Sequence, residues 1–209
     1  MSTRRGEDLA LAHRLADAAD AITLSRYQAI DLTVTTKPDN TPVTDADKSA
    51  EDAIRALLHA HRPDDGIVGE EFGTEGTEKN RYWVIDPIDG TKNFLRGVPT
   101  WATLIGLMEK QADGTEQVVV GVVSAPALFR RWYAFEGGGA FVIVNKEVPK
   151  KISVSAVSKI EDASISHSDF IGWGQRLEPF RALMEKAWRT RAHGDFWSHM
   201  LVAEGAVDI

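Results

Sequence analysis

Cysteine is absent from the 209 residues of the chain. Without it the chain can form no disulfide, no iron–sulfur cluster and no thiolate zinc site, so any metal must bind oxygen or imidazole ligands. Basic side chains are also few: 24 Lys and Arg face 31 Asp and Glu, which leaves a net charge of −7. Because nucleic acid and anionic membranes would repel such a chain, we expect no nucleic-acid and no membrane partner.

Long hydrophobic runs are missing as well. The most apolar segment, residues 118–129, is interrupted by Gly121 and Pro126 and falls short of the roughly 20 residues that a membrane helix requires. An amphipathic stretch, and not an apolar signal core, follows the first residues. Together with the missing cysteine, these features favour a cytoplasmic location.

The composition is that of an ordinary globular protein, with 43% hydrophobic and 26% charged residues. The length suits one large domain or two small lobes. Apolar residues at helical spacing predict a helix over residues 7–27, and a second helix is predicted to open at Thr44 and to end at His61-Arg62-Pro63. Between them, residues 31–42 carry two prolines and predict a loop or hairpin.

Strand patterns follow the second helix. Apolar runs bounded by Gly and Pro predict strands at residues 66–69, 82–85, 100–108, 117–124, 131–135 and 140–144. The last quarter predicts a strand at 163–168, a helix at 178–187, a strand at 188–192 and a helix at about 196–203. Two helices, a run of strands and then alternating elements indicate a layered α+β or α/β core.

The richest chemical signal is the string Trp83-Val84-Ile85-Asp86-Pro87-Ile88-Asp89-Gly90-Thr91-Lys92-Asn93-Phe94. An apolar strand delivers Asp86 and Asp89 on either side of a proline, and the Gly-Thr pair that follows lets the backbone approach a ligand closely. Mg²⁺ prefers oxygen ligands and takes a few carboxylates alongside water or phosphate. The string therefore predicts a magnesium site; the simpler alternative is a strand end followed by an Asp-Gly turn.

Two further acidic segments lie upstream. Gly69-Glu70-Glu71 ends a short apolar strand, and Thr44-Asp45-Ala46-Asp47 opens the second helix. Each has a plain alternative, because acids in loops are usually solvated and acids at a helix N-terminus favour that helix electrostatically. Two strand-terminal acid clusters in one anionic chain nevertheless favour a shared metal site.

These three segments, in this order, resemble the inositol monophosphatase superfamily of metal-dependent, lithium-sensitive phosphatases. The resemblance runs through essentially the whole chain and includes Gly121-Val122-Val123-Ser124-Ala125-Pro126-Ala127 and Gly138-Gly139-Ala140-Phe141. Within the superfamily, Leu95-Arg96-Gly97-Val98-Pro99-Thr100-Trp101-Ala102 and Arg191-Ala192-His193-Gly194-Asp195-Phe196 are most similar to actinobacterial histidinol-phosphate phosphatases.

The resemblance implies the fold class and the metals. It implies a layered αβαβα sugar-phosphatase-like variety of α+β fold, and a hydrolase that uses two or three Mg²⁺ ions per site. Glu70, Asp86 and the backbone carbonyl of Ile88 would hold the first ion, and Asp86 and Asp89 would share a second. Such a cluster lowers the pKa of bound water and requires no covalent enzyme nucleophile.

The resemblance also implies which residues act on the substrate. Thr91 and Asp47 would orient the attacking water, and with Glu70 they form the expected catalytic set. The amides of Gly90 and Thr91 would cradle the phosphate near a helix N-terminus. Lys37 lies where relatives have a lysine near the site, although a lone loop lysine is more often solvated.

The substrate implied by the resemblance is L-histidinol phosphate, which carries an ammonium group and an imidazole, so its pocket should offer carboxylates. Asp195 and Glu204 are candidates for that role, and Arg191 would orient one of them or reach the ligand. Asp195 as a mere helix cap and Glu204 as a solvated acid are the alternatives. The expected substrate-binding set is Lys37, Glu70, Asp89, Gly90, Thr91, Arg191, Gly194, Asp195 and Glu204.

The expected reaction is hydrolysis of L-histidinol phosphate to L-histidinol and phosphate in histidine biosynthesis, by a homodimer. The alternative is an inositol-1-phosphatase or a related small sugar or nucleotide phosphatase. Relatives continue beyond Ile209 with a Trp-Asp pair that completes the second metal site, so we expect one domain over residues 1–209 with a complete N-terminal lobe and an incomplete, truncated C-terminal lobe. A catalytically silent phosphate- or metal-binding fragment is the further alternative.

Overall fold

An eight-stranded mixed sheet is the largest element of the structure, a computed structural model that describes residues 3–38 and 41–209. The chain divides into two units, Met1–Lys150 and Lys151–Ile209. The strand order is β10-β9-β8-β7-β6-β5-β3-β4. Neighbours pair antiparallel from β9 through β8, β7 and β6 to β5 and between β3 and β4, whereas β3 and β5 are parallel. The strands are β3 (Gly66–Gly69), β4 (Gly73–Glu75), β5 (Arg81–Asp89), β6 (Ala102–Lys110), β7 (Glu116–Ala125), β8 (Arg130–Phe135), β9 (Gly139–Val144) and β10 (Lys150–Ile152).

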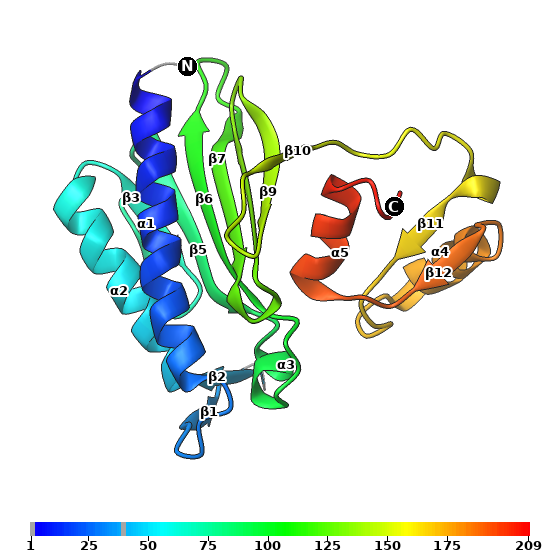
Figure 1. Cartoon of the computed structure of the whole chain (residues 1–209), viewed down its shortest axis with the longest axis horizontal. Helices are drawn as coiled ribbons and strands as arrows, with labels where there is room; N and C mark the ends of the chain where they lie inside the picture. The colour runs from blue at the N-terminus through cyan, green and yellow to red at the C-terminus, as the bar shows by residue number, and fades with distance from the viewer. Residues whose placement is uncertain (1–2, 39–40) are drawn as a thin grey trace. The chain divides into compact units, whose positions relative to one another are not determined.

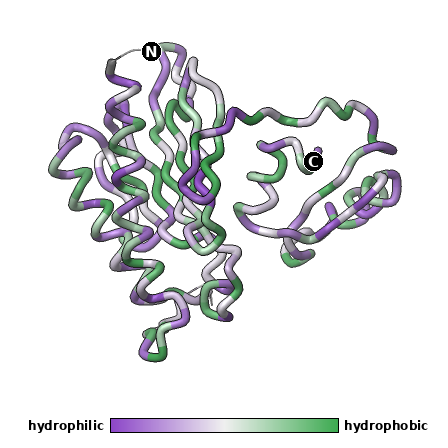
Figure 2. Tube along the Cα trace, viewed as in Figure 1, coloured by the Kyte–Doolittle hydropathy of each residue, from purple (hydrophilic) through white to green (hydrophobic). Residues whose placement is uncertain are grey.

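Two helices, α1 (Thr3–Arg26) and α2 (Asp45–His61), cover one face of this sheet (Figure 1). Leu11 and Leu15 of α1 and Ile54 of α2 pack with Trp83 and Ile105 of the strands in one core cluster, each 3% exposed or less. Figure 2 shows hydrophobic and hydrophilic residues alternating along both helices. Burying one large apolar side chain contributes about 1.5–3 kcal/mol, so this inward stripe holds the helices against the sheet.

The segment between the two helices forms the predicted hairpin. β1 (Val34–Thr36) and β2 (Pro42–Thr44) pair antiparallel, with Thr36 opposite Pro42. Of the loop or hairpin predicted over residues 31–42, residues 39–40 lie outside the described residues. Lys37 directly follows β1, at the turn of the hairpin, and Thr44 ends β2 and directly precedes α2.

Thr44 starts α2 as the sequence predicted. Its hydroxyl oxygen accepts hydrogen bonds from Ala46 N at 3.1 Å and Asp47 N at 3.3 Å, while Asp47 Oδ2 accepts from Thr44 N at 2.8 Å. This reciprocal arrangement is a capping box, which satisfies amides that the first helical turn leaves free. The helix ends at His61, because Pro63 disfavours helical geometry in the residue before it.

Residues 151–209 form the second unit. Its two-stranded sheet pairs β11 (Ser164–Ser166) with β12 (Arg189–Arg191) in parallel, α4 (Leu177–Met184) lies between them in sequence, and α5 (Asp195–Ala203) follows β12. Ser166 N donates to Ile209 O at 2.7 Å and Ser164 N donates to Asp208 Oδ2 at 2.6 Å. These bonds attach the last residues of the chain to β11.

Most elements predicted from the sequence are confirmed with shifted ends. The first helix starts at Thr3, and the strand predicted over residues 82–85 is longer, because β5 continues past Pro87 to Asp89. The short elements β4, β10 and α3 (Thr91–Leu95) were not predicted, because segments of three to five residues carry little periodicity. Within the described ranges, none of the helices has the length and apolar character needed to cross a membrane.

Candidate active site

The acidic segments meet because β3 and β5 are parallel neighbours. Their register pairs Gly69 with Ile85, so the residues that come next, Glu70 and Asp86, lie at the same edge of the sheet. Glu70 N donates to Ile85 O at 3.2 Å, which extends the ladder beyond the end of β3. The structure therefore brings together two acidic segments that are 16 residues apart in the sequence.

A bulge in β5 carries the pair Asp86 and Asp89. Between these residues the register against β6 shifts by one residue. In a regular strand, side chains three positions apart point to opposite faces, and the extra residue of the bulge returns the two acids to the same side. Pro87, which has no N–H for the ladder, lies inside the bulge, and its carbonyl accepts from the buried Thr103 hydroxyl at 2.8 Å.

Asp86 is partly buried in a negatively charged environment. Burial, followed by the charges of Glu70 and Asp89, raises the pKa of Asp86 to about 9. A hydrogen bond from Ile88 N to Asp86 Oδ1, at 3.1 Å, acts in the opposite direction. The carboxyl group thus holds a proton at neutral pH unless a cation takes that proton's place.

Lys37 brings a positive charge to this cluster. Its Nζ lies 2.7 Å from Glu70 Oε1 and 2.8 Å from Glu71 Oε1. Burial alone would lower the pKa of Lys37, but its bonds to the two glutamates raise it. The lysine side chain is only 19% exposed and Glu71 only 3%. Lys37 is therefore ion-paired with the acidic loop, and Glu71, which the sequence analysis named in that segment without giving it a role, belongs to the same cluster.

Asp47 is both a helix cap and a neighbour of Thr91. Its Oδ2 accepts from the Thr44 hydroxyl at 2.5 Å, and its Oδ1 lies 3.5 Å from Thr91 Oγ1. Thr91 Oγ1 also donates to the Ile88 carbonyl at 3.0 Å. Burial raises the pKa of Asp47, and the bonds from Thr44 lower it. The plain cap interpretation is correct for one carboxylate oxygen, while the other faces Thr91.

Gly90 starts the short helix α3. Its φ of 86° and ψ of 35° place it in the left-handed region, which glycine enters without the steric cost that a Cβ imposes. Phe94 N donates to Gly90 O at 3.0 Å. The predicted helix start at the Gly90–Thr91 pair is therefore confirmed.

A cavity of about 530 Å³ opens beside the acidic loop, a size that suits a small-molecule ligand. Its lining does not include Asp86, Asp89 or Thr91, all of which belong to the described part of the chain. The cavity thus reaches the Lys37 side of the carboxylate cluster and not its centre. It is lined by Thr35, Thr36, Lys37, Pro38, Val43, Lys48, Glu70 and Glu71.

The donor set of this cluster fits Mg²⁺. It offers carboxylate oxygens and the Ile88 carbonyl, which are ligands that hard divalent cations prefer. The raised pKa of Asp86 marks negative charge that the side chains themselves leave uncompensated. As they stand, no three His, Asp or Glu side chains within residues 3–38 and 41–209 are grouped to hold an ion. Glu70 is bonded to Lys37 instead.

The remaining predicted residues, Arg191, Gly194, Asp195 and Glu204, belong to the second unit. Gly194 is the N-cap of α5 without a side-chain cap, so the alternative in which Asp195 caps this helix is wrong. Asp195 opens α5 and the half-buried Glu204 is its C-cap, which separates them by about 13 Å along the axis. Arg191 Nη1 donates to Thr190 O at 2.8 Å. The structure therefore does not bring Asp195 and Glu204 together.

Sequence reasoning also missed Glu51 and Arg55 on α2. Glu51 is fully buried, and its carboxylate accepts from Arg55 Nε at 2.8 Å. The available signal was position, since Glu51 lies four residues after Asp47 and three before Ile54, on the inward stripe of the helix. A charged residue in an apolar stripe marks a buried polar contact.

Comparison with known proteins points to one family. Residues 5–209 match the inositol monophosphatase family. The chain is 57% identical to the histidinol-phosphatase of Streptomyces coelicolor, over 97% of this chain and 76% of that protein. It is 54% identical to the histidinol-phosphatase of Mycobacterium tuberculosis, over 97% of this chain and 77% of that protein.

A solved structure gives the same result. An inositol monophosphatase from Zymomonas mobilis superposes with a TM-score of 0.79 at 32% identity, over 99% of this chain and 76% of that one. Both the layered α+β fold and the resemblance inferred from the sequence are thereby confirmed. The chain belongs to the inositol monophosphatase family and is a phosphatase.

Proposed function

We propose that the protein is a Mg²⁺-dependent phosphomonoesterase that hydrolyses L-histidinol phosphate to L-histidinol and phosphate, a reaction of histidine biosynthesis. The metal dependence is supported by the electrostatic environment of Asp86, whose pKa is raised by burial and then by the charges of Glu70 and Asp89. The substrate rests on the two relatives named histidinol-phosphatase, which match 97% of this chain.

The carboxylates would hold the metal ions, two or three per site. Glu70, Asp86 and the carbonyl of Ile88 would bind one ion, and Asp86 with Asp89 a second. When bound, Mg²⁺ neutralises charge on the phosphate and lowers the pKa of a coordinated water. Because Asp86 must lose its proton to act as a ligand, metal binding is expected to weaken as the pH falls.

Thr91 and Asp47 would orient the attacking water. Thr44 fixes one oxygen of Asp47, so Oδ1 keeps its direction toward the Thr91 hydroxyl. When Thr91 donates its proton to Asp47 Oδ1, its oxygen is free to accept a hydrogen bond from water. Holding water in this geometry lowers the entropy cost of the attack.

We assign contacts with the phosphate and contacts with the leaving group to different residues. The amides of Gly90 and Thr91, at the start of α3, would donate to the phosphate. Lys37 would contribute positive charge on the side of the cavity. On the family resemblance, Arg191, Gly194, Asp195 and Glu204 are proposed to contact the histidinol moiety. Because Asp195 and Glu204 lie at opposite ends of α5, we assign them to different groups of the substrate.

The test measures phosphate release from L-histidinol phosphate and from myo-inositol 1-phosphate, with Mg²⁺ and with EDTA. We expect Mg²⁺-dependent turnover that favours L-histidinol phosphate and falls at least 100-fold in Asp86→Asn, the order of magnitude expected for loss of a charged metal ligand. Asp64→Asn, a change at an exposed acid outside the cluster, is the matched control and should keep full activity.

Three outcomes would contradict the proposal. Equal or faster turnover of the inositol ester would refute the substrate, and full activity in EDTA would refute the metal dependence. No turnover of either ester would favour a silent phosphate- or metal-binding role. Homodimerisation and a cytoplasmic location stay predictions, which sedimentation analysis and cell fractionation would test.

A further inference from the structure

A buried carboxylate lies directly beneath the acidic loop. The loop, residues 70–72, joins β3 to β4 and carries Glu70 and Glu71. Glu51, from the facing helix α2, is 0% exposed. Its Oε2 accepts from Glu71 N at 2.7 Å, and its Oε1 accepts from Phe72 N at 3.2 Å. One side chain thus binds two consecutive backbone amides of the loop.

The backbone amides at the tip of this loop all have partners. Glu70 N donates to Ile85 O at 3.2 Å, so the first amide is anchored to β5, and Glu51 receives the next two. Each of these hydrogen bonds restricts the conformation of the loop backbone. The directions in which the Glu70 and Glu71 side chains point are therefore fixed from two sides. One side is the strand that bears Asp86 and the other is α2.

Gly69 makes room for this contact. A Cβ built on Gly69 would lie 1.8 Å from Glu51 Oε1, far closer than a carbon and a nonbonded oxygen can approach. The absence of a side chain at this position therefore lets the carboxylate reach the amides. The requirement is one of space, independent of any special backbone angle.

Arg55 holds the carboxylate in place. Its Nε donates to Glu51 Oε1 at 2.8 Å, one helical turn away, and its Nη2 donates to the carbonyl of Gly73 at the far end of the loop. A buried ion pair contributes little to stability compared with apolar side chains of similar volume. What Glu51 supplies, and an apolar residue could not, is a pair of acceptors for the loop amides.

We propose that Glu51, supported by Arg55, is a positioning residue that sets the acidic loop so that Glu70 meets Asp86. This inference rests on the proposed function in treating Glu70 as a metal ligand. Glu51 itself touches neither substrate nor metal. Loss of its acceptors would release two amides and let Glu70 turn away, which weakens metal binding without removing a ligand.

The experiment compares Glu51→Gln with Asp52→Asn, a change at the exposed neighbouring acid of the same helix. Mg²⁺ binding is followed by titration calorimetry and by the Mg²⁺ concentration that gives half-maximal phosphate release. In Glu51→Gln we expect Kd for Mg²⁺ to rise about 10- to 100-fold, with kcat at saturating Mg²⁺ within about twofold of the wild type. Asp52→Asn should match the wild type in both.

Amide hydrogen exchange gives a readout that needs no activity. The amides of Glu71 and Phe72 should be protected in the wild type and should exchange faster in Glu51→Gln. Glu51→Asp, which keeps the charge beside Arg55 but withdraws the oxygens from the amides, should also raise Kd for Mg²⁺. It provides a folded comparison if the glutamine variant does not fold.

Two results would overturn the inference: free exchange of these two amides in the wild type, or a lowered melting temperature with an unchanged Kd for Mg²⁺ in a folded variant. The second would mean that Glu51 serves stability alone. Failure of the proposed function looks different. In that case the wild type would release no phosphate, while the exchange protection and its loss on substitution would still be measured.

Discussion

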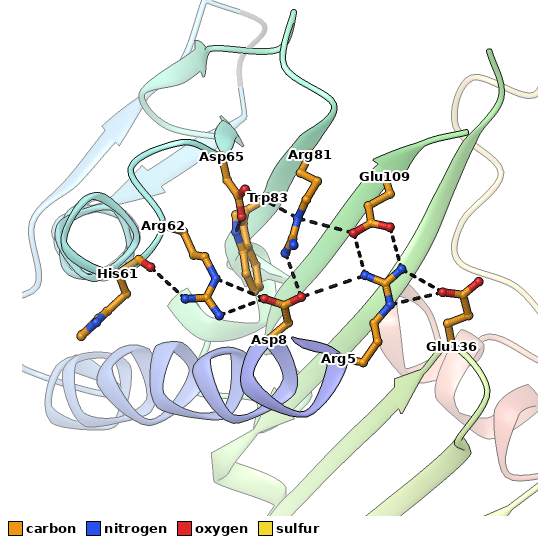
Figure 3. A network of polar contacts seen from close by, with 9 residues as sticks. All are labelled: Arg5, Asp8, His61, Arg62, Asp65, Arg81, Trp83, Glu109 and Glu136. Carbon is orange, nitrogen blue, oxygen red and sulfur yellow. Dashed lines mark hydrogen bonds and ion pairs between the residues drawn. The ribbon is translucent and has the colours of Figure 1, made fainter. Parts of the chain in front are cut away.

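The ionic network around Asp8 offers a sharp test of how α1 is held on the sheet. Asp8 is 0% exposed, and its Oδ1 accepts from Arg62 Nε at 3.1 Å and Nη2 at 3.0 Å, while its Oδ2 accepts from Arg81 Nη2 at 2.8 Å (Figure 3). Arg5 extends the network to Glu109. We consider the substitution Asp8→Asn, which keeps the shape and removes the charge.

The cost follows from what the arginines lose. The asparagine oxygen can accept from Arg62 or from Arg81 but has no second oxygen for the other. Arg81 is 8% exposed. Its Nε lies 3.6 Å from Asp65 Oδ1 and 3.5 Å from Glu109 Oε1, within ion-pair range but without a hydrogen bond, and its Nη1 has no hydrogen-bond partner among the described residues. Removing one partner of a buried pair typically costs about 3–5 kcal/mol, so we expect a loss of about that size. With an m value of about 2 kcal/mol/M, the urea midpoint would fall by about 1.5–2.5 M.

Urea unfolding followed by circular dichroism measures this change. Asp17→Asn is the control, because Asp17 lies on the same helix and pairs with Arg131 at 2.7 Å but is 67% exposed. An exposed pair contributes about 0–1 kcal/mol, so the control should barely shift the midpoint. A loss below about 1 kcal/mol for Asp8→Asn would refute the reasoning, since the buried carboxylate would then contribute no more than an exposed one.

Three further predictions concern stability. Thr44→Ala should lose about 1 kcal/mol or slightly more of unfolding free energy and Thr44→Ser should recover most of it, measured by urea unfolding. Burial raises the pKa of Asp20, so the native state binds the Asp20 proton more tightly than the unfolded chain does. The contribution of Asp20 to stability therefore falls as the pH rises above about 4. In Asp20→Asn the urea midpoint should fall less as the pH rises, and a pH profile identical to that of the wild type would contradict this. Gly69→Ala should lose about 1–3 kcal/mol of unfolding free energy and weaken Mg²⁺ binding, because the new Cβ collides with Glu51. Gly121→Ala is the control: its Cβ would meet nothing within 4 Å, so it should lose less than about 1 kcal/mol, also measured by urea unfolding.

The elements that the sequence predicted well are those with a strong local signal. Both long helices have an inward stripe of apolar residues, and the second has a capping threonine. The string from Trp83 contains its own strand, acids and turn, so its local structure is legible without the rest of the chain. The helix start near Gly90 and Thr91 came instead from the family resemblance, and the short helix α3 was not predicted from its own sequence pattern.

What the sequence did not predict depends on partners far away in the chain. Lys37 is an ordinary loop lysine until the hairpin places it beside Glu70 and Glu71, more than 30 residues later. Glu51 is one acid among many on α2 until the loop beyond β3 presents its amides. Asp195 was predicted to bind substrate, with a helix cap as the alternative, and the N-cap position is occupied by Gly194. Tertiary contacts of this kind override local preference.

The bulge at Pro87 divides β5 into a part that packs in the core and a part that positions Asp89. The alternation that buries Trp83 and Ile85 ends just before it, and the placement of Asp89 depends on the one residue that the bulge adds. Deleting that residue would leave the upstream packing intact and would turn Asp89, with the helix start behind it, to the opposite face. The same deletion would also displace Ile88 and Phe94, which are buried in a second core cluster beside the site. The bulge therefore ties the position of a proposed metal ligand to the packing of that cluster, so a change at this point should lower stability and activity together.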